Sequence, residues 1–155
     1  MYRKFLRTGC AAGLLVALST MVAADDDESM ERGRYLVKIA GCNDCHTSGY
    51  MEKEGKVPEA EWLMGDRLGW RGPWGTSYAI NLRLYFAALS EARWLTIARQ
   101  LRTRPPMPWF TVAEMTDEDL KAIYAFVRSL GPGGEAAPAY LPPDQEPPPP
   151  YIQFP

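Results

Sequence analysis

Two cysteines three positions apart, followed at once by a histidine, constrain this sequence more than any other feature. They form the segment Cys42-Asn43-Asp44-Cys45-His46, and the 155-residue chain contains no other histidine. A disulfide between residues this close would staple little of a fold, so the pair needs another explanation. The single histidine excludes bis-histidine metal sites and zinc sites that need two imidazoles.

The pattern Cys-x-x-Cys-His is typical of covalent attachment of a c-type haem. Two thiols on one helical turn add to the two vinyl groups, and the adjacent imidazole is held beneath the iron. A redox-active dithiol would need a thioredoxin-like βαβ framework, and no strand-rich region surrounds the motif. A zinc site would lack a second Cys-x-x-Cys or histidine. We therefore expect one haem c, bound through Cys42 and Cys45 with His46 as an iron ligand.

The N-terminus of the chain predicts export. Three basic residues precede an apolar run, which ends in Val22-Ala23-Ala24, a pattern that fits a signal-peptidase site. The run is shorter than the ~20 residues that cross a bilayer. We expect a cleaved signal peptide over residues 1–24, the loss of Cys10 with it, a periplasmic location and no transmembrane segment afterwards. An uncleaved anchor is the alternative.

Composition divides the remaining chain into two parts. Without the signal peptide, 14 Lys and Arg face 19 Asp and Glu, a net charge of −5 that argues against a nucleic-acid partner. Nine of the 14 prolines lie after Leu130. We therefore expect a folded haem domain over residues 25–130 and a proline-rich tail over 131–155. The tail should be extended and solvated, with a strand that docks a partner as the alternative.

Amphipathic spacing predicts three helices in the folded part. The predicted N-caps are Ser29, Ser90 and Thr116. Apolar residues follow each cap at intervals of three and four. Gly33 in the first helix should allow close approach of an aromatic residue such as Tyr124 in the last. Residues 47–79 lack a long periodic pattern and are expected to wrap one haem edge as a loop.

The end of this loop contains candidates for haem binding. The second ring N–H of a ligating histidine normally donates to a carbonyl, and the Gly72-Pro73 backbone is the expected acceptor. Candidate hydrogen-bond donors to the haem propionates are Thr76, Tyr78 and Asn81. Ordinary turn positions are the alternative interpretation of these residues.

The sixth iron position can be filled by a methionine or a lysine, or can stay open. Met107 is the leading candidate because prolines on both sides fix the backbone and position its thioether in advance. Met64 is the next candidate. Met30 and Met115 lie at predicted helix starts, where packing explains them.

Several motifs, taken in order, resemble those of class I c-type cytochromes. They are Gly33-Arg34-Tyr35-Leu36-Val37, the attachment segment, Pro73-Trp74-Gly75-Thr76 with Tyr78 and Asn81, Pro106-Met107-Pro108-Trp109, and Met115 to Leu120. The loop motifs are especially similar to haem domains of cytochrome subunits that accept electrons from periplasmic alcohol, aldehyde and sugar-acid dehydrogenases. The resemblance implies an all-α fold of three to five helices around one haem, with His46 and Met107 as axial ligands. Those subunits usually carry three haem domains, whereas this chain has one attachment site.

The resemblance implies an electron carrier and not an enzyme, because a His/Met iron has no vacant position for a substrate. The expected partners are periplasmic or membrane redox proteins, with a dehydrogenase as donor and an oxidase or cytochrome as acceptor. A subunit of a dehydrogenase complex is one alternative. A haem enzyme or sensor with a labile sixth ligand is another. Candidates for steering an acidic partner are Arg93, Arg99, Arg102 and Arg104.

Overall fold

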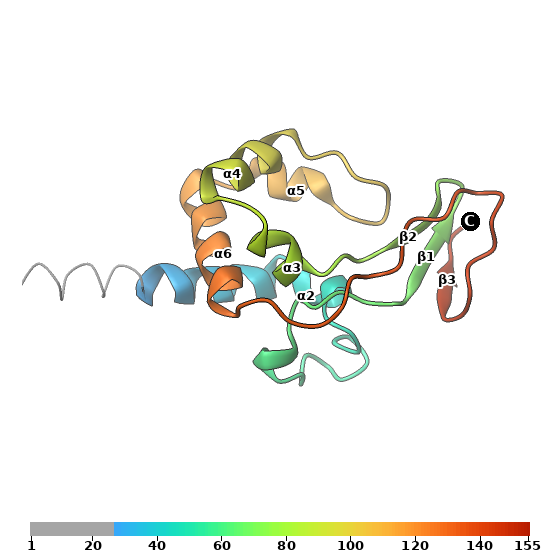
Figure 1. Ribbon diagram of the computed structural model, residues 1–155, viewed down its shortest axis with the longest axis horizontal. Helices are drawn as coiled ribbons and strands as arrows, with labels where there is room; N and C mark the ends of the chain where they lie inside the picture. Colours follow the sequence, from blue (N-terminus) through green and yellow to red (C-terminus); the bar gives the residue numbers. More distant parts are fainter. Residues whose placement is uncertain (1–26) are drawn as a thin grey trace, which may run out of the picture.

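Helices form the body of the molecule, and a small sheet lies at one end of it (Figure 1). The structure, a computed structural model, describes residues 27–155, so the predicted signal peptide lies outside the described residues. Residues 27–39 are helical. The later helices are α2 (Cys42–His46), the 3-10 turn η1 (Glu59–Glu61), α3 (Leu82–Ala87), α4 (Glu91–Gln100), α5 (Trp109–Glu114) and α6 (Asp117–Ser129). The strands are β1 (Gly69–Gly72), β2 (Gly75–Tyr78) and β3 (Tyr151–Gln153).

Two of the three predicted N-caps are present. The Ser90 side chain accepts a hydrogen bond from the Arg93 backbone N–H, and that of Thr116 accepts one from the Asp119 N–H. Each bond satisfies a donor that the first helical turn leaves free. The prediction for Ser29 is wrong, because residues 27 and 28 are already helical.

The core lies where α6 meets the first helix, α3 and α4. Its largest members include Leu36, Val37, Trp62, Leu63, Phe86, Trp94, Leu120, Phe126 and Val127. A Cβ at Gly33 would overlap the Ala122 carbonyl, so the two helices approach as closely as a glycine permits. The predicted close approach is present, but its partner is not Tyr124. The Tyr124 hydroxyl donates instead to the Leu89 carbonyl, 2.9 Å away.

The three-stranded sheet was not expected in an otherwise helical fold. β1 and β2 form an antiparallel hairpin in which Trp70 faces Ser77, and β3 pairs in parallel with β1. The segment predicted as an irregular loop therefore ends in regular structure. Gly75 has a positive φ of 94° at the hairpin turn, and the aromatic and β-branched residues around it favour strands.

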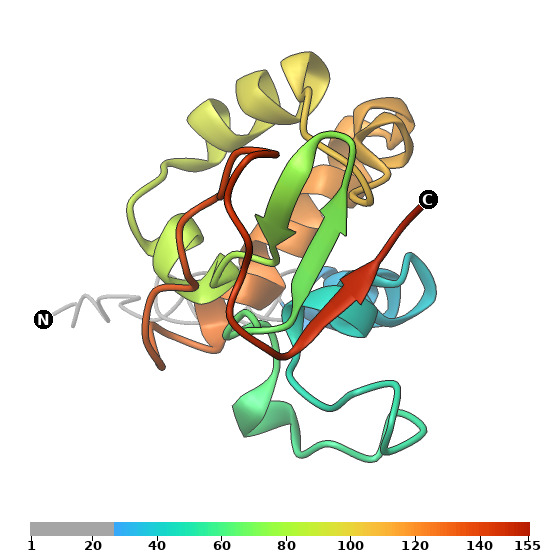
Figure 2. The ribbon, with the colours of Figure 1, turned by 90° about the vertical axis from the view of Figure 1, so that its right-hand side faces the viewer.

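The tail of residues 131–155 does not extend into solvent as expected. Figure 2 views the sheet end of the molecule, where the tail runs along the β1–β2 hairpin and returns beside it as β3. Phe154 packs against Trp70 and Trp74, with ring centroids 6.1 and 5.5 Å apart. The expectation of a solvated tail considered its prolines and acidic residues, and overlooked aromatic residues that find apolar partners on the hairpin.

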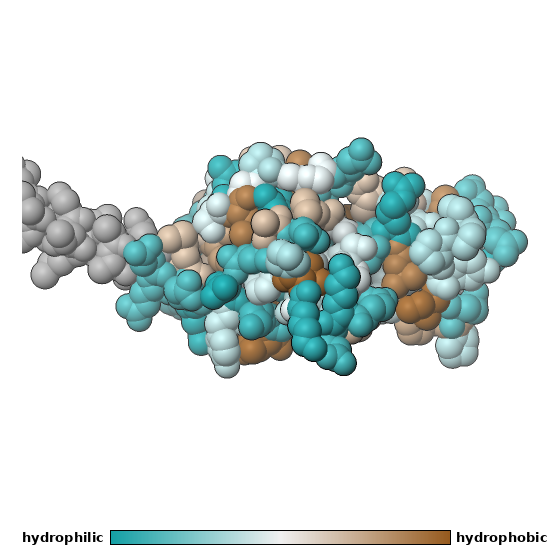
Figure 3. Space-filling view, turned by 90° about the horizontal axis from the view of Figure 1, so that it is seen from below, coloured by the Kyte–Doolittle hydropathy of each residue, from teal (hydrophilic) through white to brown (hydrophobic). Residues whose placement is uncertain are grey.

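Most of the surface seen in Figure 3 is hydrophilic, with smaller apolar areas between the polar side chains. Within residues 27–155, no helix combines the length and the apolar character that crossing a membrane requires.

Candidate functional site

A cavity of about 600 Å³ lies between the helices, the hairpin and the tail. Its walls are mostly apolar and include Val37, Phe86, Trp94, Leu101, Ile123 and Val127. The volume is within the ~300–1,000 Å³ usual for sites that enclose a cofactor. Part of what would otherwise be the core of this small domain is therefore a space for a large apolar group.

Helix α2 presents both thiols and the imidazole to this cavity. Cys42, Cys45 and His46 all line it. The opposite side of α2 is held by buried hydrogen bonds: the Thr47 hydroxyl donates to Asn43 Oδ1 at 2.7 Å and accepts from the Leu63 N–H at 2.8 Å. The sequence spacing thus produces the one-sided arrangement that attachment of a flat group through two thiols requires.

The ring of His46 is oriented by a backbone carbonyl. Nδ1 lies 2.8 Å from the Ile80 carbonyl oxygen, which can only accept, so Nδ1 carries the proton and the Nε2 lone pair stays free. Burial lowers the pKa of His46, which keeps the imidazole neutral and able to bind a metal.

The expected acceptor, the Gly72-Pro73 backbone, is therefore wrong. Pro73 lies exposed at the hairpin turn and is not among the cavity-lining residues. Ile80 precedes Asn81, the N-cap of α3, and is not part of a regular element, so its carbonyl is free to accept. The cap at Asn81 was the sequence signal that could have indicated this carbonyl.

The two thiols do not have the character of a reactive dithiol. Burial raises the pKa of Cys42 to about 11. Burial also raises the pKa of Cys45, and the charges of Asp44 and Asp66 add to the effect. Redox-active Cys-x-x-Cys pairs depend on a lowered thiol pKa. The environment of this pair therefore argues against the dithiol interpretation.

Two methionines line the cavity, and only one of them was ranked as a ligand from the sequence. Met107 and Met115 are both in its wall, whereas Met64, the second candidate, is not. Met64 packs against the glycines at the start of the tail, so that a Cβ at Gly134 would lie 3.1 Å from its sulfur. No lysine is among the residues described as lining the cavity, so Met115 replaces both Met64 and lysine as the alternative to Met107.

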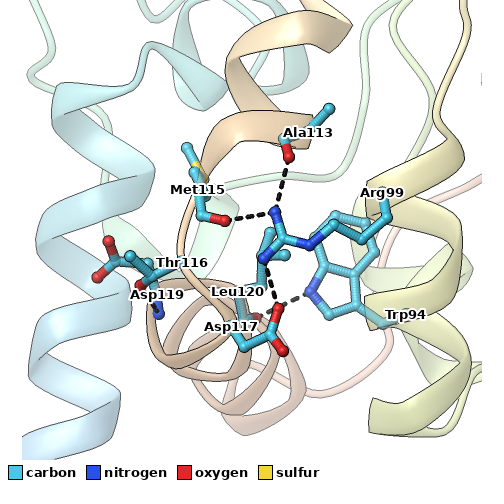
Figure 4. A network of polar contacts seen from close by, with 8 residues as sticks. All are labelled: Trp94, Arg99, Ala113, Met115, Thr116, Asp117, Asp119 and Leu120. Carbon is cyan, nitrogen blue, oxygen red and sulfur yellow. Dashed lines mark hydrogen bonds and ion pairs between the residues drawn. The ribbon is translucent and has the colours of Figure 1, made fainter.

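The segments that carry these methionines are held by arginines. Figure 4 shows the Arg99 guanidinium donating to the carbonyls of Ala113 (2.6 Å) and Met115 (2.5 Å) and pairing with Asp117. Arg99 therefore ties α4 to the joint between α5 and α6. Its predicted role in steering a partner is wrong, because its side chain is used within the fold.

Two further arginines of the predicted patch stack on aromatic rings. The Arg102 guanidinium lies 4.0 Å from the Trp109 ring centroid, and that of Arg104 lies 3.7 Å from the Tyr140 centroid. Both distances fit cation–π contact. Arg104 and Met107 line the same cavity from one loop.

Of the three predicted propionate donors, Tyr78 alone lines the cavity. Asn81 accepts from the Leu84 N–H and donates to the Gly133 and Glu135 carbonyls, so its amide is occupied by the fold. The Thr76 hydroxyl is buried without a hydrogen-bond partner, away from the lining residues.

The sequence analysis missed Ser77. Ser77 lines the cavity beside its cross-strand partner Trp70, and its hydroxyl is buried and unpartnered. Adjacent residues in a strand face opposite sides, so recognising the hairpin would have distinguished Ser77 from Thr76.

The residues present fit a covalently bound haem. The cavity has apolar walls for a porphyrin, two thiols and an imidazole on α2, and thioethers on another wall. The unpartnered Ser77 hydroxyl and the Arg104 guanidinium are suitable groups for carboxylates.

Comparison with known proteins agrees with this site. Residues 30–131, more than half of the chain, match the family Cytochrome c. The chain therefore belongs to the cytochrome c family: it is an electron-transfer domain that carries a covalently bound haem c.

The particular relative that matches is a subunit of nicotinate dehydrogenase from Pseudomonas putida. It is 31% identical over 120 residues, which cover 71% of this chain and 9% of the relative. The chain thus spans less than a tenth of that protein's length. No solved structure matches the chain.

Proposed function

We propose that the chain is a periplasmic electron carrier with one haem c, attached through Cys42 and Cys45 and ligated axially by His46 and Met107. The observation that carries the proposal is that all four side chains line one apolar cavity. Bound there, the haem supplies a one-electron redox centre. The export signal predicted over residues 1–24 supports the location, because covalent haem attachment takes place outside the cytoplasm.

The protein's own residues have three tasks in this function. The Ile80 carbonyl orients His46 and leaves Nε2 free for iron. The prolines beside Met107 limit the conformations of its loop, so little entropy is lost when its sulfur binds. The apolar walls exclude water, which together with a methionine ligand favours Fe(II) and raises the potential.

A redox titration of the exported holoprotein tests the carrier function. We expect a single reversible one-electron wave and a six-coordinate, low-spin absorption spectrum in both oxidation states, without added ligand. A five-coordinate, high-spin spectrum would contradict the proposal and favour the haem enzyme or sensor. The proposed donor is a dehydrogenase, and the proposed acceptor is an oxidase or another cytochrome.

Membership of a dehydrogenase complex is the second candidate function. It is favoured by the similarity to the nicotinate dehydrogenase protein, which is itself named as a subunit. Pull-down of the tagged holoprotein from its native periplasm separates the two functions. A freely diffusing carrier should elute alone in size-exclusion chromatography, whereas a subunit should elute with a partner in fixed stoichiometry.

A further inference from the structure

The tail of residues 132–155 lies outside the part of the chain that matches the cytochrome c family. It nevertheless supplies part of the wall of the cavity. Ala137, Pro138, Ala139 and Tyr140 all line it. In Figure 1 the tail leaves the end of α6, passes α3 and reaches the sheet at the other end of the molecule. A segment beyond the family domain thus completes the site that the family's haem requires.

Three sets of hydrogen bonds fix the course of the tail. Near its start, Asn81 Nδ2 donates to the carbonyls of Gly133 (2.7 Å) and Glu135 (3.0 Å). In the middle, the backbones of Thr76 and Leu141 exchange bonds of 2.7 and 3.1 Å. At the end, β3 pairs with β1. The tail is therefore anchored on both sides of the residues that line the cavity.

The hairpin is shaped to receive the tail. A Cβ at Gly75 would overlap the Leu141 carbonyl oxygen, and one at Gly69 would lie 3.1 Å from the Tyr151 Cβ. Beyond β3, the Phe154 ring packs against both Trp70 and Trp74. Glycines where the tail approaches and aromatic residues where it ends indicate a built contact.

Tyr140 connects the tail to the loop that carries Met107. Its hydroxyl donates to the Trp74 carbonyl at 2.9 Å, and its ring lies under the Arg104 guanidinium at 3.7 Å. Arg104 is three residues before Met107, and both line the cavity. A displacement of Tyr140 would therefore free one anchor of the Met107 loop and open one wall of the cavity.

We propose that the C-terminal tail is a fixed shield of the haem cavity, in which Tyr140 positions the Met107 loop through Arg104. This proposal rests on the proposed haem ligation. The shield limits access of water and small ligands to the iron, and the Tyr140–Arg104 contact slows departure of the loop. An external ligand then reaches the iron only when the tail or the loop opens locally.

The rate at which carbon monoxide binds to the full-length ferrous holoprotein measures this access. We compare Tyr140→Ala, which removes the loop contact, with Phe154→Ala, which removes the anchor on the two tryptophans. We expect roughly threefold to tenfold faster binding for Tyr140→Ala and about tenfold or more for Phe154→Ala. The redox potential should fall in both variants, because water gains access to the haem.

Two variants serve as controls. Ile152→Ala changes an exposed residue in the same tail that does not line the cavity, and it should match the parent. Tyr140→Phe keeps the ring under Arg104 and loses the bond to Trp74, so its rate should lie closer to the parent than that of Tyr140→Ala. A general loss of folding would not produce this order. If Phe154→Ala does not accumulate, the two Tyr140 variants decide the question.

Parent-like carbon monoxide rates and potentials in both Tyr140→Ala and Phe154→Ala would overturn the shield. Failure of the proposed ligation has a different signature, because the parent itself would then lack the iron–sulfur absorption band. With an open iron position, the carbon monoxide rate would still report access past the tail. The two proposals are therefore distinguished by the spectrum of the parent and the rates of the variants.

Discussion

The two walls of the cavity that carry the candidate iron ligands are held in different ways. On the α2 side, His46, Thr47 and Asn43 are buried and bonded to the Ile80 carbonyl and the Leu63 N–H. On the methionine side, the anchors are exposed guanidinium groups, with Arg99 on backbone carbonyls and Arg104 over a ring. Buried hydrogen bonds are costly to break, whereas exposed charged contacts contribute little. We therefore expect the methionine side to open first.

Replacement of Met107 should produce the largest effect on the iron. Met107→Ala should abolish the long-wavelength sulfur-to-iron band of the ferric protein and lower the potential on the order of 0.1 V or more, within the ~0.8 V that axial ligands control. Met64→Ala and Met115→Ala, measured in the same way, should keep the band. Its loss in Met115→Ala alone would assign the ligand to Met115 and remove the exposed loop from the comparison.

A substitution behind α2 tests the buried side. Thr47→Val preserves shape but leaves the Leu63 N–H and Asn43 Oδ1 without their partner. The expected loss is about 2 to 4 kcal/mol of unfolding free energy, since each unpaired buried group costs ~1–3 kcal/mol. Denaturant unfolding of the holoprotein measures it. The control is Ser48→Ala, an exposed neighbour, which should change the free energy by less than ~0.5 kcal/mol. Equal effects from both would contradict a rigid α2 wall.

The exposed side should respond more weakly and in another observable. Arg99→Ala should cost about 1 kcal/mol, because it removes an exposed ion pair and two bonds to carbonyls. The sulfur-to-iron band should then disappear at a lower denaturant concentration than global unfolding. Arg93→Ala is the matched control, since the described residues offer its side chain no hydrogen bond or ion pair. Simultaneous loss of band and fold in Arg99→Ala would show that the two walls open together.

Charge steering is the smallest expected effect. Arg93 is the member of the predicted patch that reports charge without disturbing a stack or a clamp. With ferricyanide as an anionic oxidant, Arg93→Glu should slow electron transfer roughly twofold at low salt. The difference should shrink in high salt, because exposed charges are screened beyond ~8 Å at physiological ionic strength. A rate equal to the parent at every salt concentration would exclude steering at this position.

Local signals predicted the α2 side and two helix starts well. Attachment spacing, the caps at Ser90 and Thr116, and the methionine between prolines all act over a few residues, so the sequence contains them directly. The Ile80 acceptor, the Arg99 clamp and the return of Phe154 to Trp70 depend on residues many positions apart. No periodicity indicates such pairs. The tail was misjudged for the same reason, since proline content describes its backbone and says nothing of its partner.

The mass of the exported protein tests the central claim most directly. A covalent haem c at Cys42 and Cys45 predicts an intact mass equal to the chain from Asp25 plus one haem, unchanged after denaturing acidic extraction. Cys42→Ser/Cys45→Ser should lose this added mass. Haem that is extracted from the parent, or two thiols in the holoprotein that react with an alkylating reagent, would contradict the account.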